Sequence, residues 1–303
     1  MKLAISGHWY AGPDDNTAPY YQNFFGYLGA LRQRTLFRQR MQAQGDVVGF
    51  ELLEDSLPPL SEGFIDPMGL AEPTAEDYEK LGVLDIGMIN RSRLSMVGRA
   101  REMVVEGAQE WGADWLLAWD SDMLFPVSGF MQLWRRQKLV CAALAFTARH
   151  PIHPVIYRMR THRDPQGFDV IDGSDIVLDY PRDALLDDAV VGGPLAFGAG
   201  MVLFDMRVFR ELPKPWFNST GCGEDWFFCH RLSKHGIPRY VDTCVKTMHK
   251  EHTARWACEE TYWPERLAAR QTYADLFGAG VSEVQRGDDG VIYPVTGSGR
   301  LAK

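Results

Sequence analysis

An apolar strand that ends in two carboxylates constrains this chain more than any other feature. Residues 115–119 read Trp-Leu-Leu-Ala-Trp, and Asp120-Ser121-Asp122 follows directly. Residues 94–111 keep apolar side chains at helical spacing, and Gly112 predicts the end of that helix. Ligands of open α/β sheets bind at the carboxyl ends of the strands. The segment therefore predicts such a sheet with two carboxylates at its binding edge.

The neighbouring elements predict an α/β fold with a mostly parallel central sheet flanked by helices. Residues 2–6 and 47–53 read as strands joined by a helix over about 20–44. This β-α-β order favours parallel pairing. The later predicted elements are helix 126–137, strand 139–146, strand 153–159, a Gly-rich apolar run over 190–203, helix 205–212, helix 224–235, strand 238–242 and helix 264–277.

We predict one domain over residues 1–277 and a Gly-rich tail over 278–303. Two excursions are expected inside the domain. Residues 57–80 are irregular and rich in Pro, Gly and acids, and residues 160–189 read as a polar, acidic hairpin or loop.

The composition predicts a soluble protein of the cytoplasm. Apolar residues make up 46% and charged residues 24%, as in ordinary globular proteins. The amino terminus turns polar after Ile5, which argues against a signal peptide, and no apolar run is long enough to cross a bilayer. The five cysteines are odd in number and lack a C-x-x-C motif, which favours reduced thiols.

The two carboxylates after the apolar strand suit Mg²⁺ or Mn²⁺. These ions prefer oxygen ligands and commonly take one or two carboxylates together with substrate phosphates. Such an ion would neutralise a departing nucleoside diphosphate. Zinc bound by His249, His252 and Cys258 is the rival interpretation, although these residues lack a paired ligand set.

With these motifs the chain resembles the GT-A glycosyltransferases, especially the large inverting family that includes cellulose and chitin synthases. The resemblance covers roughly residues 2–252. It rests on the strand with Asp120-Ser121-Asp122, the Gly-rich run Phe197–Phe204, Gly223-Glu224-Asp225, and a late histidine, His249. It implies a single GT-A (Rossmann-like) domain and a metal-dependent, inverting transferase that uses a nucleotide-sugar donor, most often a UDP-sugar.

The resemblance also implies roles for single residues. Asp120 and Asp122 would bind Mn²⁺ or Mg²⁺, and His249 would complete the metal shell. Asp225 would be the general base that takes the proton of the acceptor hydroxyl. Glu224 would share the acidic pair or bind a hydroxyl. The alternative is that Glu224 and Asp225 only begin a helix, where negative charge is favourable.

The donor would lie along the ends of the first strands. Family members often carry Ala-Arg-Asn before the D-x-D segment, whereas this chain has Arg99-Ala100-Arg101-Glu102. Either arginine could reach a diphosphate, and a solvated position is the alternative for Arg101. The residues predicted to bind the nucleotide sugar are Ser6, His8, Glu54, Ser56, Arg99, Arg101, Ser121 and Gly200.

The acceptor prediction rests on a further likeness. The layout is similar to small bacteriophage-encoded glycosyltransferases, some of which modify hydroxymethylated pyrimidines in DNA; a phage protein would work in the host cytoplasm. Net charge is −8, which argues against nucleic acid, but residues 149–163 are basic. Arg149 and Arg158 are therefore predicted to contact acceptor phosphates. Trp216 is predicted either to stack on a sugar or to anchor the core.

Other functions stay open at this stage. The acceptor could instead be a saccharide, a lipid-linked sugar or a protein. A nucleotidyltransferase also uses paired carboxylates and Mg²⁺, but it normally has a Gly-rich phosphate loop with Lys or Arg after its first strand, which residues 6–10 match poorly. A catalytically silent nucleotide-sugar-binding protein is the third class.

Overall fold

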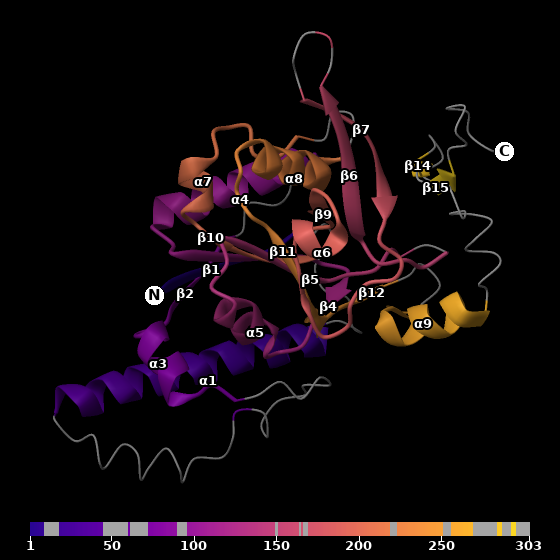
Figure 1. Ribbon diagram of the computed structural model, residues 1–303. Helices are drawn as coiled ribbons and strands as arrows, with labels where there is room; N and C mark the ends of the chain where they lie inside the picture. Colours follow the sequence, from indigo (N-terminus) through magenta and orange to yellow (C-terminus); the bar gives the residue numbers. More distant parts are fainter. Residues whose placement is uncertain are drawn as a thin grey trace.

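The structure is a computed structural model (Figure 1). It describes residues 1–8, 18–44, 60, 72–89, 96–148, 151–163, 165, 169–218, 223–250, 256–268, 284–286 and 292–294. The predicted strand 47–53 and parts of both predicted excursions lie outside these residues. The bounds of the domain and its tail stay predictions.

A seven-stranded sheet forms the centre of the molecule. Five of its strands run in one direction, and β10 and β8 run opposite to their neighbours. The predicted mostly parallel sheet is therefore confirmed. The strand order is β2 (Asp85–Met88), β1 (Lys2–His8), β3 (Trp115–Asp120), β10 (Met201–Asp205), β5 (Val140–Leu144), β11 (Tyr240–Lys246) and β8 (Leu185–Leu186).

Strand β2 was not expected from the sequence. It has only four residues, and one of them is Gly87, so it lacks the apolar alternation of a strand. The structure explains the glycine. A Cβ at Gly87 would lie 2.9 Å from the Trp111 ring, so only glycine lets that ring pack on the strand.

Helices cover both faces of the sheet (Figure 1). One face carries α1 (Ala18–Ala43), α3 (Ala75–Leu81) and α5 (Gly129–Arg135), and the other carries α4 (Val97–Trp111), α7 (Val208–Glu211) and α8 (Glu224–Lys234). Alternate residues of a strand point to opposite faces. Leu117 and Trp119 accordingly join the core beneath α1, while Leu116 and Ala118 join the core beneath α4 and α8.

Two small sheets extend the central one. Strand β6 (Ile156–Arg163) pairs with β7 (Asp169–Ile176) and β9 (Leu195–Phe197), so much of the predicted excursion is a hairpin. Strand β12 (Met248–Lys250) pairs with β4 (Met123–Leu124) and β13 (Trp256–Ala257). The remaining elements are α6 (Asp188–Val191), α9 (Glu259–Ala268), β14 (Val284–Arg286) and β15 (Ile292–Pro294).

The last helix differs from its prediction. It begins at Glu259, five residues before the expected start, so that Pro264 lies inside it. Among the described residues no helix is both long and apolar enough to cross a membrane. Four of the five cysteines lie in the described part of the chain, and each is a free thiol.

Candidate active site

The carboxyl ends of β1 and β3 lie side by side at the point where the strand order of the sheet changes direction. From β1 the chain continues to β2 on one side, and then crosses back to β3 on the other side. Open α/β sheets bind ligands in the crevice at such a switch point. The register brings His8 opposite Asp120, which is the first carboxylate of the D-x-D motif.

Hydrogen bonds hold the D-x-D turn from two sides. The Tyr21 hydroxyl, which α1 supplies, donates to the carbonyl oxygens of Ser121 at 2.9 Å and Met123 at 3.1 Å. The Asp120 amide donates to the Gly200 carbonyl at 3.0 Å, which ties the turn to the start of β10. The turn is therefore fixed by a side chain and a backbone that lie far from it in sequence.

Three carboxylates surround the buried guanidinium of Arg101. Its Nη2 lies 3.0 Å from Asp120, and its Nε lies 3.4 Å from Glu224 and 3.7 Å from Asp225. The Arg101 side chain is 5% exposed, so these charges meet with little water between them. We call these four residues the Arg101 cluster. It joins the end of β3 to the amino terminus of α8 through a helix on one face of the sheet.

Asp225 is held in an environment that favours its protonated form. Its Oδ2 accepts a hydrogen bond from the Ala199 amide at 3.0 Å, whereas Oδ1 is shielded from solvent without a hydrogen-bond partner. Burial, together with the charges of Glu224 and Asp120, raises the pKa of Asp225 to about 7, although Arg101 opposes this. A carboxylate with a pKa near neutrality is suited to act as a general base.

Burial also raises the pKa of Asp120 above its ordinary value, and the negative charge of Asp122 acts in the same direction. The guanidinium of Arg101 lowers it and so limits the shift. The Arg101 cluster therefore concentrates negative charge that one cation only partly neutralises. Shifted pKa values of this kind gather at functional sites more often than elsewhere.

Asp122 and His249 form the second part of the site. His249 Nε2 lies 3.2 Å from Asp122 Oδ2, and His249 Nδ1 lies 2.8 Å from the Phe146 carbonyl oxygen. Because only Nδ1 as donor satisfies that carbonyl, a neutral ring turns the lone pair of Nε2 toward the carboxylate. A proton on Nε2, or a cation bound between Nε2 and Asp122 Oδ2, removes the repulsion between this lone pair and the carboxylate. Burial lowers the pKa of His249, but the hydrogen bond and charge of Asp122 outweigh it and raise the pKa.

This donor set fits a divalent cation. A metal-bound histidine usually donates its other ring N–H to a carbonyl or carboxylate, as Nδ1 does toward Phe146 here. In the described part of the chain, however, no three His, Cys, Asp or Glu side chains are grouped closely enough to hold a metal by themselves. Two protein ligands, with the remaining positions filled by substrate oxygens or water, match the usual preference of Mg²⁺ and Mn²⁺.

The residues predicted for the donor are distributed unevenly. Ser6 is fully buried, and its hydroxyl has no hydrogen-bond partner. Arg99 is half exposed and pairs with Glu106, whereas Arg101 is buried and pairs with carboxylates, and its contact with a diphosphate stays a prediction. Gly200 contributes its carbonyl to the turn, and a Cβ there would lie 2.9 Å from Met123. Glu54, Ser56 and the side chain of His8 lie outside the described residues.

The two described residues that were predicted for the acceptor, Trp216 and Arg158, do not form one surface. Trp216 is 3% exposed, packs against Phe209 and donates from Nε1 to the Leu212 carbonyl, so its ring is no stacking wall, and the core alternative holds. Arg158 lies 2.5 Å from Asp175 across the β6–β7 hairpin. Arg149 lies outside the described residues.

Sequence reasoning missed Tyr21, Ala199 and the bridging position of Arg101. Tyr21 shares helical spacing with Phe24 and Leu28 and therefore reads as a core residue. Ala199 acts through its amide, which leaves no trace in a sequence. Arg101 was placed in the site without its carboxylate partners, because a sequence does not show that one side chain of α4 reaches both the end of β3 and the start of α8.

Comparison with known proteins yields only distant likenesses. The sequence matches no protein-family model and no curated protein. Among solved structures, A197 from STIV aligns with a TM-score of 0.38 and 13% identity over 58% of this chain and 81% of that one. GalNAc-T7 with UDP, GalNAc and Mn²⁺ aligns at 0.34 and 16% over 57% of this chain and 34% of that chain. An apo UDP-glucose pyrophosphorylase aligns at 0.36 and 10% over 90% and 99%. At these scores none of them decides the function.

Proposed function

We propose that the protein is a metal-dependent glycosyltransferase that moves a sugar from a nucleotide-sugar donor to an acceptor hydroxyl. One observation carries the proposal: a carboxylate with a pKa of about 7, Asp225, lies in the same charge cluster as the D-x-D residue Asp120. That cluster lies at the switch point of the sheet, beside the Asp122–His249 pair. A base and a metal site close together are what direct sugar transfer requires.

The proposed reaction is a single displacement with inversion at the anomeric carbon. Asp225 takes the acceptor's hydroxyl proton as that oxygen bonds to the anomeric carbon. The bond from this carbon to the phosphate oxygen breaks, and the nucleoside diphosphate leaves with the bond's electron pair. Mn²⁺ or Mg²⁺, held by Asp122 and His249 with Asp120 nearby, would supply charge neutralisation for the diphosphate. Arg101, which pairs with both Glu224 and Asp225, keeps Asp225 in place.

For the donor we propose a UDP-sugar, and for the acceptor the hydroxymethyl group of a modified pyrimidine in DNA. Two partly exposed basic side chains of β6 support the proposed DNA acceptor. Arg158 is 44% exposed and Arg160 is 30% exposed. Both already face Asp175 of the same hairpin, at 2.5 Å and 3.7 Å, which weakens their attraction for phosphate. A saccharide, lipid-linked or protein acceptor requires no basic surface and is the other arm of the acceptor test.

The deciding experiment follows leaving-group release. The purified protein is incubated with Mn²⁺ and a panel of nucleotide sugars, with and without DNA that contains hydroxymethylcytosine. Release of nucleoside diphosphate that this DNA stimulates supports the full proposal. Release that only a saccharide or protein stimulates rejects the DNA acceptor alone. Pyrophosphate formation from a nucleoside triphosphate and a sugar phosphate would show a nucleotidyltransferase, and absence of any turnover would leave a silent binding protein.

Variants connect this activity to the site. Asp225→Asn removes the proposed base, and Asp122→Asn removes a metal ligand with little change in shape. Both should lower the rate of transfer by about 10²-fold or more, but only Asp122→Asn should weaken Mn²⁺ binding in the absence of donor. Glu76→Gln is the control, since this side chain is 73% exposed and pairs with Lys80 of the same helix, α3. Activity retained in Asp225→Asn would rule out the proposed base.

A further inference from the structure

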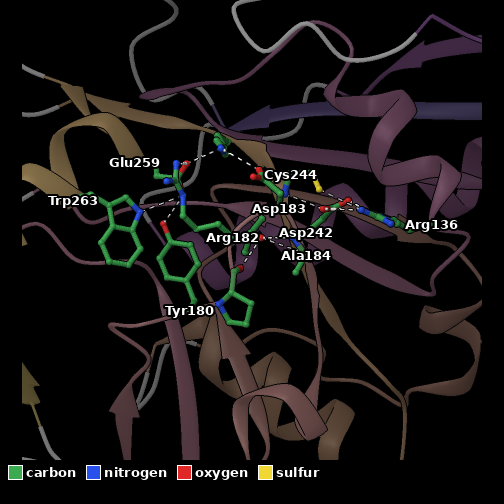
Figure 2. Close-up of polar contacts among 12 residues, drawn as sticks. Arg136, Tyr180, Arg182, Asp183, Ala184, Asp242, Cys244, Glu259 and Trp263 are labelled. Atoms are coloured by element: carbon green, nitrogen blue, oxygen red, sulfur yellow. Dashed lines mark hydrogen bonds and ion pairs between the residues drawn. The ribbon is translucent and has the colours of Figure 1, made fainter.

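A second buried charge cluster lies outside the catalytic machinery. The carboxylate of Glu259, 2% exposed, accepts hydrogen bonds from Tyr180 at 3.0 Å and from two nitrogens of Arg182 at 3.1 Å (Figure 2). Lys246 Nζ lies 2.7 Å away, and Trp263 Nε1 lies 3.4 Å away. We call these five residues the Glu259 cluster. Burial alone would raise the pKa of Glu259, but Arg182 and Lys246 outweigh burial and lower it.

The position of this cluster in the chain links it to the active site. Lys246 is the last residue of β11, three residues before His249, and Glu259 is the first residue of α9. Between them lie β12 and β13, which pair so that His249 faces Ala257. The Lys246–Glu259 ion pair therefore joins the two ends of the β12–β13 hairpin.

The same hairpin is attached to the D-x-D turn. His249 is the register partner of Met123, and the Lys250 amide donates to the Asp122 carbonyl at 2.9 Å. The hairpin that carries the His249 imidazole is therefore fixed at the D-x-D turn on one side and at the Lys246–Glu259 ion pair on the other. A buried ion pair is expensive to form, and here it closes the one hairpin, within the described residues, that carries a predicted metal ligand.

We propose that Glu259 is a positioning residue, which holds the His249 imidazole against Asp122 by closing the β12–β13 hairpin through Lys246. The inference rests on the proposed metal site. Groups that hydrogen-bond directly to a metal ligand typically contribute about 10–100-fold to metal affinity, and we expect the lower end of that range for Glu259, which acts from further away. Glu259 does so through the hairpin backbone, without contact to the metal or the substrate.

The test compares variants that break the Lys246–Glu259 ion pair with a variant that removes Arg182, which lies outside the hairpin. Glu259→Gln and Lys246→Gln each break the closure of the hairpin, and each should weaken Mn²⁺ binding about tenfold in titration calorimetry without donor. Arg182→Gln is the matched control. It removes two hydrogen bonds from the same carboxylate, but Arg182 is 56% exposed and lies outside the hairpin, so Mn²⁺ affinity should stay within about twofold. If Glu259→Gln fails to fold, Lys246→Gln carries the same expectation.

A double-mutant cycle separates positioning from general stability. In a His249→Ala background, Glu259→Gln and Lys246→Gln should cause no further loss of Mn²⁺ affinity, because the ligand they position is absent. Equal weakening in both backgrounds would show that the Glu259 cluster only stabilises the fold, and the inference would be wrong.

A metal-free measurement makes the two proposals fail separately. The ring-nitrogen NMR signals of His249, assigned by their loss in His249→Ala, should shift in Glu259→Gln and Lys246→Gln but not in Arg182→Gln. Unshifted signals would overturn the positioning role while leaving the proposed function intact. Shifted signals combined with unchanged Mn²⁺ affinity in His249→Ala would instead reject His249 as a ligand and support the positioning.

Discussion

The Arg101 cluster and the Glu259 cluster have opposite compositions. In the Arg101 cluster one cation faces three carboxylates, and Asp225 Oδ1 is left without a hydrogen bond. In the Glu259 cluster one carboxylate faces two cations and two further donors. The pKa of Asp225 is raised and that of Glu259 is lowered, although both carboxylates are shielded from water.

The difference shows how one fold uses buried charge in two ways. Buried charges that are paired hold segments together, because separating the pair would leave a buried charge without its partner. Excess like charge destabilises the folded chain, and such strain is tolerated where a reactive group is needed. Burial raises the pKa of both carboxylates, and the number of cations that face each one decides whether that rise is overcome.

The largest expected effect is the loss of activity in Asp225→Asn. General bases typically contribute about 10²–10⁴-fold to a rate, and we expect kcat to fall by that much. The same variant should be at least as stable as the wild type at pH 8, because it removes a carboxylate repelled by Asp120 and Glu224. Steady-state kinetics and urea unfolding measure the two effects. A large loss of stability would place Asp225 with the structural carboxylates.

Glu259→Gln should show the reverse pattern in stability. Breaking a buried ion pair typically costs about 3–5 kcal/mol, and the lower value is expected because the partner Arg182 is half exposed. The free energy of unfolding from urea titration measures this loss. A decrease below about 1 kcal/mol would contradict the assignment of this pair as structural.

The two carboxylates should also respond to pH in opposite directions. Asp225 must be ionised to act as base, so kcat/KM should rise as pH increases through about 7.

The raised pKa of Asp225 also affects stability, because it means that the folded chain binds this proton more tightly than the unfolded chain. The resulting stability is lost between its ordinary value of 3.8 and about 7 as pH rises. Glu259, with a lowered pKa, stabilises the fold above its ordinary value of 4.5, and this is lost as pH falls. Unfolding of wild type and Asp225→Asn from pH 4 to 8 tests the first sign, and unfolding of wild type and Glu259→Gln from pH 2 to 6 tests the second.

Arg101→Gln should move the acid limb of the activity profile. Arg101 lowers the pKa of Asp225 against the effect of burial, so its removal should raise that pKa further. A neighbouring opposite charge commonly shifts a carboxyl pKa by about 1–3 units, and we expect the midpoint of kcat/KM to move up by about one. Loss of activity with an unchanged midpoint would show that Arg101 acts on the substrate instead.

The smallest effect is expected for Arg158→Gln. This arginine pairs with Asp175 at the surface of the β6–β7 hairpin and is 44% exposed. Exposed pairs contribute about 0–1 kcal/mol, so the free energy of unfolding should fall by less than about 1 kcal/mol. A loss as large as that of Glu259→Gln would remove the distinction between buried and exposed pairs.

The sequence predicted the parts of this molecule whose signals are local. The apolar strand before Asp120, the helix that begins at Glu224, and the α/β class follow from spacing and composition. The resemblance placed Asp225 and His249 in the site. The Arg101 cluster needed the tertiary structure, because its members lie on α4, β3 and α8. A sequence also does not distinguish Glu259 from any acid in the first turn of a helix, where such residues are common.

The direction of β10 could not be predicted from the sequence. The Gly-rich run before Phe204 reads as a buried strand whichever way it points, and only the register shows that β10 opposes β3 and β5. The reversal brings the beginning of β10 to the site. The Ala199 amide and the Gly200 carbonyl therefore contact Asp225 and Asp120 there.

The central place of β10 also sets the order in which the chain can mature during synthesis. This strand lies between β3 and β5, so the β2-β1-β3 half and the β5-β11-β8 half of the sheet meet only through it. Until residue 205 has left the ribosome, β3 and β5 keep unpaired edges, which are prone to pairing with other chains. A chain cut before β10 therefore exposes one edge of β3 and both edges of β5, whereas a chain cut just after β10 still exposes the β5 edge that β11 covers.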